Sequence, residues 1–243
     1  MELTIVDMYP DILNMYGDIG HVQIVKQRCQ WRGINVNIKS FTKGKDNIFF
    51  PEETDIVLIG GGSDNGQSIV SQHLLKQRHL LEEYIEMGGV VLAICGSYQM
   101  FVNKYIDVDG NPIPCLEIFD IETISSNNRL IGNIVLENNI NLNPKTLVGF
   151  ENHGGRTYHN YKNLGKVKVG HGNNGEDKKE GMVYKNFIGT YLHGPILPKN
   201  PQLADNLIFN ALNGKYNIKH LEKLNDEIEI MAHQTMVKRL LNK

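Results

Sequence analysis

The sequence predicts an α/β protein with a mostly parallel central sheet, helices on both faces and antiparallel strands in its second half. Two short runs, residues 55–59 and 90–94, are apolar on both faces, the first of them after Asp55, which is typical of buried parallel strands. Glycines follow both runs, and segments with helical spacing lie between the predicted strands. This alternation favours parallel strands joined by crossover helices.

The elements of the first half follow in order along the chain. Strands are expected at 3–6, 34–38, 55–59 and 90–94, and helices at 19–31, 67–87 and 98–104. The glycine pair after residue 87 ends the second of these helices. Three of these four strands are thus followed by a helix before residue 105.

The second half has a different character. Short β-like runs occur within 121–148 and 166–191, and the polar stretch 171–181 is expected to be a solvated loop between two strands. Residues 203–212 predict an amphipathic helix that ends near Gly214. We expect one domain over residues 1–243, with a C-terminal helical tail over 221–243.

Composition excludes several classes of protein. The 243 residues include 25 basic and 27 acidic side chains, a formal charge of -2, whereas nucleic acids and anionic membranes require clustered positive charge. No apolar run approaches the ~18 residues of a membrane span, and the N-terminus lacks a signal-peptide pattern. We therefore expect a cytoplasmic protein that has no transmembrane segment and binds no nucleic acid.

Cys95 has the sequence context of a nucleophile. It follows a buried strand and is followed by Gly96 and a predicted helix, so the turn would hold the sulfur above the sheet. The helix N-terminus favours a thiolate, and the next amide points to a developing oxyanion. A buried structural cysteine is the alternative, and it is our reading of Cys29 and Cys115. The three cysteines show no metal-ligand spacing.

The loop after the 55–59 strand is rich in glycine. Residues 60–62 are all glycine, which lets a backbone amide turn toward a tetrahedral intermediate beside Cys95. A tight turn without function is the alternative. The loop has neither the lysine of a Walker motif nor a GxGxxG pattern, so nucleotide binding is poorly supported.

A thiolate nucleophile needs a base that also protonates the leaving amine, and histidine suits this role. Of nine histidines, His193 lies at the end of a predicted strand, and His153 is its rival in an Asn-His-Gly-Gly sequence. No histidine pair has the spacing of a metal site, so no catalytic metal is assigned.

Three motifs in this order resemble class I glutamine amidotransferases of the cobyric-acid-synthase-like branch, which have a flavodoxin-like fold. They are Ala-Ile-Cys-Gly-Ser-Tyr-Gln at 93–99, Gly-Phe-Glu-Asn-His-Gly-Gly-Arg-Thr at 149–157 and Gly-Thr-Tyr-Leu-His-Gly-Pro at 189–195. The sequence Leu-Asn-Met-Tyr-Gly-Asp-Ile-Gly at 13–20 narrows the resemblance to the glutaminase subunits of lipid II isoglutaminyl synthases.

The resemblance implies a role for each site residue. Cys95 would be the nucleophile and His193 the base and acid, with hydrolysis of L-glutamine through a cysteinyl thioester. Arg129 would bind the substrate α-carboxylate, a task suited to a guanidinium. The oxyanion would be held by glycine amides, those of Gly61, Gly62 and Gly96.

The resemblance also implies a partner. This chain would hold no cofactor and would form a heterodimer with a MurT-like Mur-ligase subunit, on which ATP and magnesium are expected. Ammonia would pass to that subunit, which amidates the D-glutamate of lipid II.

One feature departs from many class I enzymes. They carry a glutamate two residues after the histidine, whereas this chain has Pro195 there, so the group that orients the imidazole is absent from its usual place. Glu151 and Asp18 are candidates, and we expect weak glutaminase activity in isolation. A cysteine hydrolase or peptidase of the same fold, and a catalytically silent module that binds a ligase, are the alternative functions.

Overall fold

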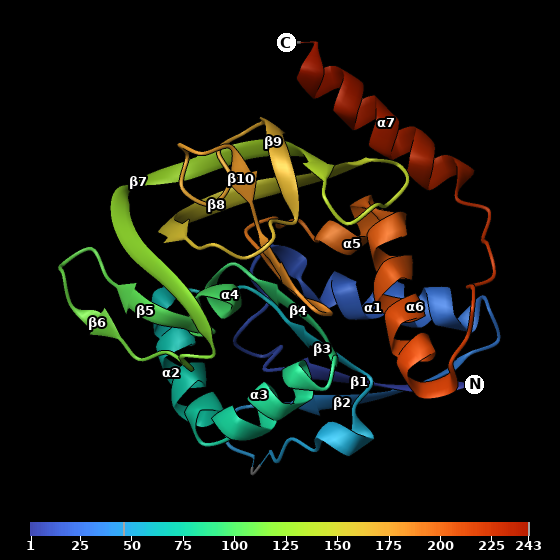
Figure 1. The fold of residues 1–243 in the computed structure, drawn as a ribbon, viewed down its shortest axis with the longest axis horizontal. Coiled ribbons are helices and arrows are strands. Elements are labelled where there is room, and N and C mark those ends of the chain that lie inside the picture. Colours follow the sequence, from blue (N-terminus) through green and yellow to red (C-terminus); the bar gives the residue numbers. More distant parts are fainter. Residues whose placement is uncertain (46, 243) are drawn as a thin grey trace.

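The computed structural model describes residues 1–45 and 47–242, and its chain forms two sheets (Figure 1). The first sheet has the strand order β11-β12-β4-β3-β1-β2 and is parallel except for β11 at its edge. Its strands are β1 (Glu2–Met8), β2 (Asn35–Phe41), β3 (Ile56–Ile59), β4 (Val90–Ile94), β11 (Met182–Tyr184) and β12 (Phe187–Thr190).

Helices cover the first sheet. The chain moves outward in opposite directions from β1 to β2 and from β3 to β4, so right-handed crossovers place α1 on one face and α2 with α3 on the other (Figure 1). The helices and turns are α1 (Ile19–Gln30), α2 (Asp64–Leu75), α3 (Arg78–Glu86), α4 (Gly96–Met100), α5 (Ile196–Lys199), α6 (Pro201–Tyr216), α7 (Glu227–Leu241) and the 3₁₀ turns η1 (Met15–Gly17) and η2 (Pro51–Glu53). The predicted fold class is therefore confirmed.

The second sheet is mostly antiparallel and is built around the long hairpin of β7 and β8. Its strands are β5 (Val102–Ile106), β6 (Pro112–Ile113), β7 (Phe119–Asn138), β8 (Thr146–Tyr158), β9 (Gly165–Val169) and β10 (Lys179–Glu180). A bridge between Phe150 of β8 and His193, with hydrogen bonds of 3.1 and 2.7 Å, connects this sheet to the end of the first one.

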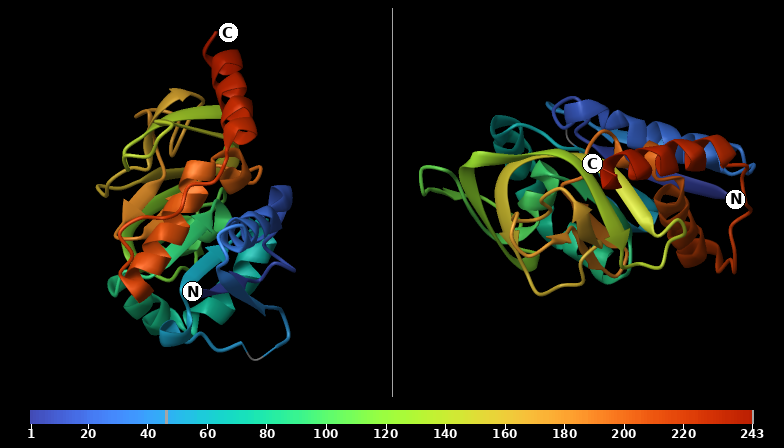
Figure 2. Two further views of the ribbon diagram at one scale, coloured as in Figure 1. Left: turned by 90° about the vertical axis from the view of Figure 1, so that its right-hand side faces the viewer. Right: turned by 90° about the horizontal axis from the view of Figure 1, so that it is seen from above.

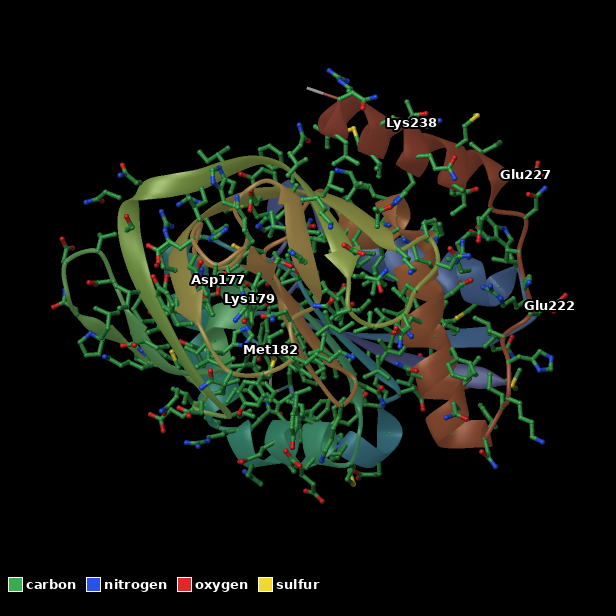
Figure 3. The ribbon with its side chains drawn as sticks, turned by 45° about the horizontal axis from the view of Figure 1, so that its top comes forward. Asp177, Lys179, Met182, Glu222, Glu227 and Lys238 are labelled. Atoms are coloured by element: carbon green, nitrogen blue, oxygen red, sulfur yellow. The ribbon has the colours of Figure 1, made fainter. Side chains whose placement is uncertain are left out.

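The C-terminal segment crosses the surface before it forms α7. Residues 217–226 are not helical, and Figure 3 shows Glu222 on this stretch and Glu227 and Lys238 near the two ends of α7. The buried Arg28 of α1 fixes the segment, because its guanidinium donates to both Asp205 of α6 and Asp226. α7 lies beside the outer part of the second sheet (Figure 2).

Several predicted boundaries were wrong. The helix expected over 67–87 is two helices separated at residues 76–77, and the helix expected over 98–104 ends at Met100 because β5 begins at Val102. The C-terminal helix begins at Glu227 rather than 221, and α6 continues past Gly214 to Tyr216. Among the described residues, no helix is long and apolar enough to cross a membrane.

Candidate active site

Four neighbouring strands of the first sheet bring the candidate residues together. Cys95 follows β4, the residues 60–62 follow β3, and His193 lies three residues beyond the end of β12. Asp18 lies in the connection that follows β1. Because parallel strands end at the same edge of a sheet, one edge collects all of these groups, as is usual for ligand sites in α/β folds.

Cys95 occupies a strained turn between β4 and α4. Its backbone has φ 52° and ψ -106°, a left-handed conformation that is costly for a residue other than glycine. The surrounding hydrogen bonds hold the turn: the Cys95 amide donates to Thr190 O at 2.7 Å, and Ser97 Oγ accepts from the Ile94 amide at 2.7 Å. Cys95 is itself buried, with 8% of its surface exposed, and it lines a cavity at this edge of the sheet.

The other two cysteines have different surroundings. Cys29 and Cys115 are buried, and burial raises the pKa of each thiol to about 12, which keeps both protonated at neutral pH. Neither of them lines the cavity at Cys95.

The cavity beside Cys95 has a volume of about 340 Å³ and lies between the edge of the first sheet and the inner side of the β7–β8 hairpin. Its walls are mostly polar side chains and glycine backbone. The lining residues are Met15, Tyr16, Gly62, Ser63, Gln67, Cys95, Gln99, Tyr105, Val108, Ser125, Ser126, Arg129, Asn152, His153, Gly154 and Gly155. This volume suits a ligand of amino-acid size.

The predicted oxyanion donors have unequal surroundings. Gly96 begins α4, where the first amides have no acceptor within the helix, and a β-carbon there would lie 2.3 Å from Gln67 Nε2. Gly62 lines the cavity. The Gly61 amide instead donates to Asp18 Oδ2 at 2.7 Å, so in this conformation it is not directed at the cavity.

Arg129 lies on β7, at an irregularity in its pairing with β8, and lines the cavity. Its Nε donates to Asn152 Oδ1 at 2.7 Å and its Nη2 donates to Asn152 O at 2.8 Å. These contacts fix one edge of the guanidinium, which leaves the edge formed by Nη1 and Nη2 able to receive a carboxylate.

His193 is fully buried, and burial lowers the pKa of its imidazole to about 4, with a smaller contribution from the charge of Arg129. Neither ring nitrogen has a hydrogen-bond partner among the described residues. The ring lies against Gly61, where an added β-carbon would meet His193 Cε1 at 2.7 Å. A neutral, unpartnered imidazole is thus held beside the glycine loop.

Asp18 is the carboxylate that faces His193. Its Oδ2 lies 3.9 Å from His193 Nδ1, and burial raises the pKa of this carboxyl to about 7 although the Gly61 amide acts in the opposite direction. The other candidate, Glu151, lies elsewhere: its two oxygens accept the amides of His171 and Gly172. Geometry therefore favours Asp18 as the group that orients the imidazole.

His153, the rival base, is held in a different way. Its Nδ1 donates to Gly155 O at 2.8 Å, so its Nε2 is the unprotonated nitrogen, and burial lowers the pKa of the ring to about 3. The ring stacks on Tyr191 at 3.7 Å between centroids. Among the described residues, no cluster of three or more histidine, cysteine or acidic side chains has the geometry of a metal site.

Tyr16 and Asn152 are among the site residues that were not predicted from sequence, and they contact predicted ones. The Tyr16 ring lies 4.8 Å from the His193 ring between centroids, and Asn152 Nδ2 donates to the Tyr16 hydroxyl. Both belong to motifs that carry the family resemblance, so their position in those motifs was the available signal.

Comparisons with known proteins show the family to which the chain belongs. Residues 4–201 match the CobB/CobQ-like glutamine amidotransferase domain. The chain is 46% identical over 238 residues to the lipid II isoglutaminyl synthase (glutamine-hydrolyzing) subunit GatD of Staphylococcus aureus, covering 98% of this chain and 96% of that one. It is 38% identical to the subunit of the same name from Streptococcus pneumoniae, covering 88% and 82% of the two chains.

A solved structure also shares the fold. A glutamine amidotransferase from Thermotoga maritima superposes with a TM-score of 0.53 at 15% identity, covering 99% of both chains. At this level of identity the likeness shows the fold alone.

Proposed function

The chain belongs to the family of CobB/CobQ-like glutamine amidotransferase domains, and we propose that it is the glutamine-hydrolysing subunit of a lipid II isoglutaminyl synthase. One observation supports the chemistry: Cys95, on a strained turn, and His193, which is buried and faces the carboxylate of Asp18, follow neighbouring strands of the same sheet. The names of the two relatives supply the biological setting.

The reaction begins with substrate binding. Arg129 binds the α-carboxylate of glutamine through the free edge of its guanidinium, which directs the side-chain amide toward Cys95 across the cavity. The Cys95 thiolate then attacks the amide carbon, and the C–N bond of the tetrahedral adduct breaks. The amide of Gly96, at the start of α4, is placed to stabilise the oxyanion.

His193 manages the protons in both half-reactions. Its neutral imidazole first takes the proton of the Cys95 thiol, which forms the thiolate. The imidazolium then donates that proton to the departing nitrogen, which leaves as ammonia, and Cys95 remains as a glutamyl thioester. It then accepts a proton from the water that attacks the thioester, and this step releases glutamate and restores the thiolate. Asp18 holds the imidazole in the reactive orientation.

The same geometry supports low activity in the isolated subunit. Asp18 Oδ2 is engaged with the Gly61 amide, and His193 Nδ1 is 3.9 Å away, beyond hydrogen-bonding distance. Ammonia is useful only if a second subunit consumes it, so we propose that a MurT-like ligase, which supplies ATP and magnesium, binds this chain and favours the active arrangement.

Ammonia release tests this function. The purified chain with glutamine should release little ammonia until the ligase is added, and Cys95→Ala should abolish release in the complex. Cys29→Ala is the matched control, because Cys29 is a buried cysteine that does not line the cavity. A glutamine-like diazo-ketone should label Cys95 alone.

Other outcomes would identify the alternatives. Turnover by Cys95→Ala at the rate of the unchanged protein would end the proposal. Cleavage of short peptides without glutamine would indicate a peptidase. Absence of any diazo-ketone adduct, even with the ligase present, would indicate a silent binding module.

A further inference from the structure

Tyr16 lies directly on the imidazole of His193. The two ring centroids are 4.8 Å apart, and the Tyr16 ring also packs on Phe150 at 5.8 Å. His193 is 0% exposed whereas Tyr16 is 41% exposed. The phenol ring therefore separates the imidazole from solvent.

The backbone of Tyr16 is held in an unfavourable conformation. Its φ of 62° and ψ of 19° are left-handed, and the next residue, Gly17, is also left-handed with a φ of 78°. The flanking residues stabilise this turn, because the Met15 amide donates to Gly61 O and the Ile19 amide donates to Asn14 Oδ1. Strain at a residue other than glycine often marks a functional position.

A chain of hydrogen bonds joins Tyr16 to the predicted substrate-binding arginine. Asn152 Nδ2 donates to the Tyr16 hydroxyl, and Asn152 Oδ1 accepts from Arg129 Nε at 2.7 Å. All three side chains line the cavity, whereas His193 is not among the described residues that line it. Asn152 is therefore hydrogen-bonded both to the arginine that would bind a ligand and to the tyrosine whose ring covers His193.

We propose that Tyr16 is a positioning residue of the glutaminase reaction: its ring shields and places the His193 imidazole, and its hydroxyl links that placement, through Asn152, to the occupancy of Arg129. This inference rests on the proposed roles of Arg129 and His193. Two separable effects follow, because the ring and the hydroxyl have different partners.

The ring is tested without any enzymatic activity. The pH titration of the His193 Cε1 proton is followed by NMR in the full chain carrying Cys95→Ala, with the resonance assigned by His193→Gln. Removal of the ring in Tyr16→Ala should raise the midpoint by about one pH unit or more, toward the value of a solvated histidine. Tyr16→Asn is a second variant without the ring, and asparagine tolerates the left-handed backbone.

Matched controls define the result. Tyr16→Phe retains the ring and should leave the midpoint unchanged, as should Tyr158→Ala, which removes a tyrosine that is also 41% exposed. An unchanged midpoint in both Tyr16→Ala and Tyr16→Asn would overturn the shielding role.

The hydroxyl is tested in the complex with the ligase. Tyr16→Phe should raise the KM for glutamine roughly three- to tenfold with kcat within about twofold, since loss of the hydrogen bond frees Asn152 and with it Arg129. An unchanged KM would refute the link. If the unchanged complex released no glutamate from glutamine, the proposed function would fail, while the NMR titration would still report on Tyr16.

Discussion

Replacement of Asp18 by asparagine should make the protein less active and more stable. The carboxylate lies 3.9 Å from His193 Nδ1 and is 4% exposed, so it acts on the imidazolium through a partly desolvated medium. Two unit charges at this separation interact with about 4 kcal/mol at an effective permittivity of 20. Because the pKa of Asp18 is raised to about 7, the group is half protonated at pH 7, which reduces that contribution by ~0.4 kcal/mol.

The expected loss of rate follows from this interaction. About 3.6 kcal/mol corresponds to a fall in kcat of roughly 10²- to 10³-fold for Asp18→Asn. The unchanged enzyme should lose kcat as the pH falls through about 7, since protonation removes the charge, and the variant should lack this acidic limb. The assay is glutamate release by the complex between pH 5.5 and 9.

Stability should change in the opposite direction. The folded-state pKa of Asp18 is raised from 3.8 to about 7, so ionisation of this group destabilises the fold increasingly between these two pH values and fully above them. Asp18 Oδ1 also lies 3.9 Å from His21 Nδ1. The shift in the pKa of Asp18 corresponds to about 4 kcal/mol, and an asparagine amide that faces His21 without an acceptor costs ~1–3 kcal/mol. Asp18→Asn should therefore raise the melting temperature by a few degrees at pH 8.

Two results would refute this reasoning. A variant that keeps more than a third of the kcat together with the acidic limb would show that Asp18 does not act on His193. A lower melting temperature at pH 8 would show that its carboxylate stabilises the fold rather than the reaction.

Three further predictions concern other groups. Arg129→Lys should raise the KM for glutamine roughly tenfold or more with less effect on kcat, since an ammonium cannot form the bidentate contact; steady-state kinetics measures this. Gly61→Ala should lower kcat at nearly constant KM, because its β-carbon would lie 2.7 Å from His193 Cε1, whereas Gly214→Ala in α6 meets no neighbour within 4 Å and should leave kcat unchanged. Burial raises the pKa of Glu180 from 4.5 to about 8, so ionisation of this carboxyl destabilises the fold as the pH rises from 5 to 9. Glu180→Gln should therefore show a smaller fall in melting temperature over this pH range in thermal melts.

The parts of the fold that were predictable are those with local signals. β4 matches its prediction at both ends, because five consecutive apolar residues bounded by glycine and cysteine are typical of a buried strand. The strand β7 was not predictable as one element of 20 residues. Its centre, residues 125–129, is polar and resembles a loop, and the pairing with β8 that ends at Ser125 and resumes at Leu130 was not visible in the sequence.

Some residues of the site were likewise predictable from local signals, and others were not. Cys95 and His193 each follow a strand, so sequence places both at one edge of the sheet. The choice between Asp18 and Glu151 depends on contacts between distant segments: the Glu151 carboxylate is engaged by the amides of His171 and Gly172, about twenty residues later in the chain. No local pattern predicts that engagement.

Asp18 faces both His193, the proposed base, and the Gly61 amide, a predicted oxyanion donor. It therefore connects the orientation of the base with the formation of the oxyanion hole. Its Oδ2 accepts the Gly61 amide at 2.7 Å and lies 3.9 Å from His193 Nδ1. A movement of about 1 Å toward the imidazole would form a hydrogen bond there and release the Gly61 amide for an oxyanion. Orientation of the base and completion of the oxyanion hole would then occur in one step. A partner that stabilises this single displacement would therefore raise the rate of both half-reactions.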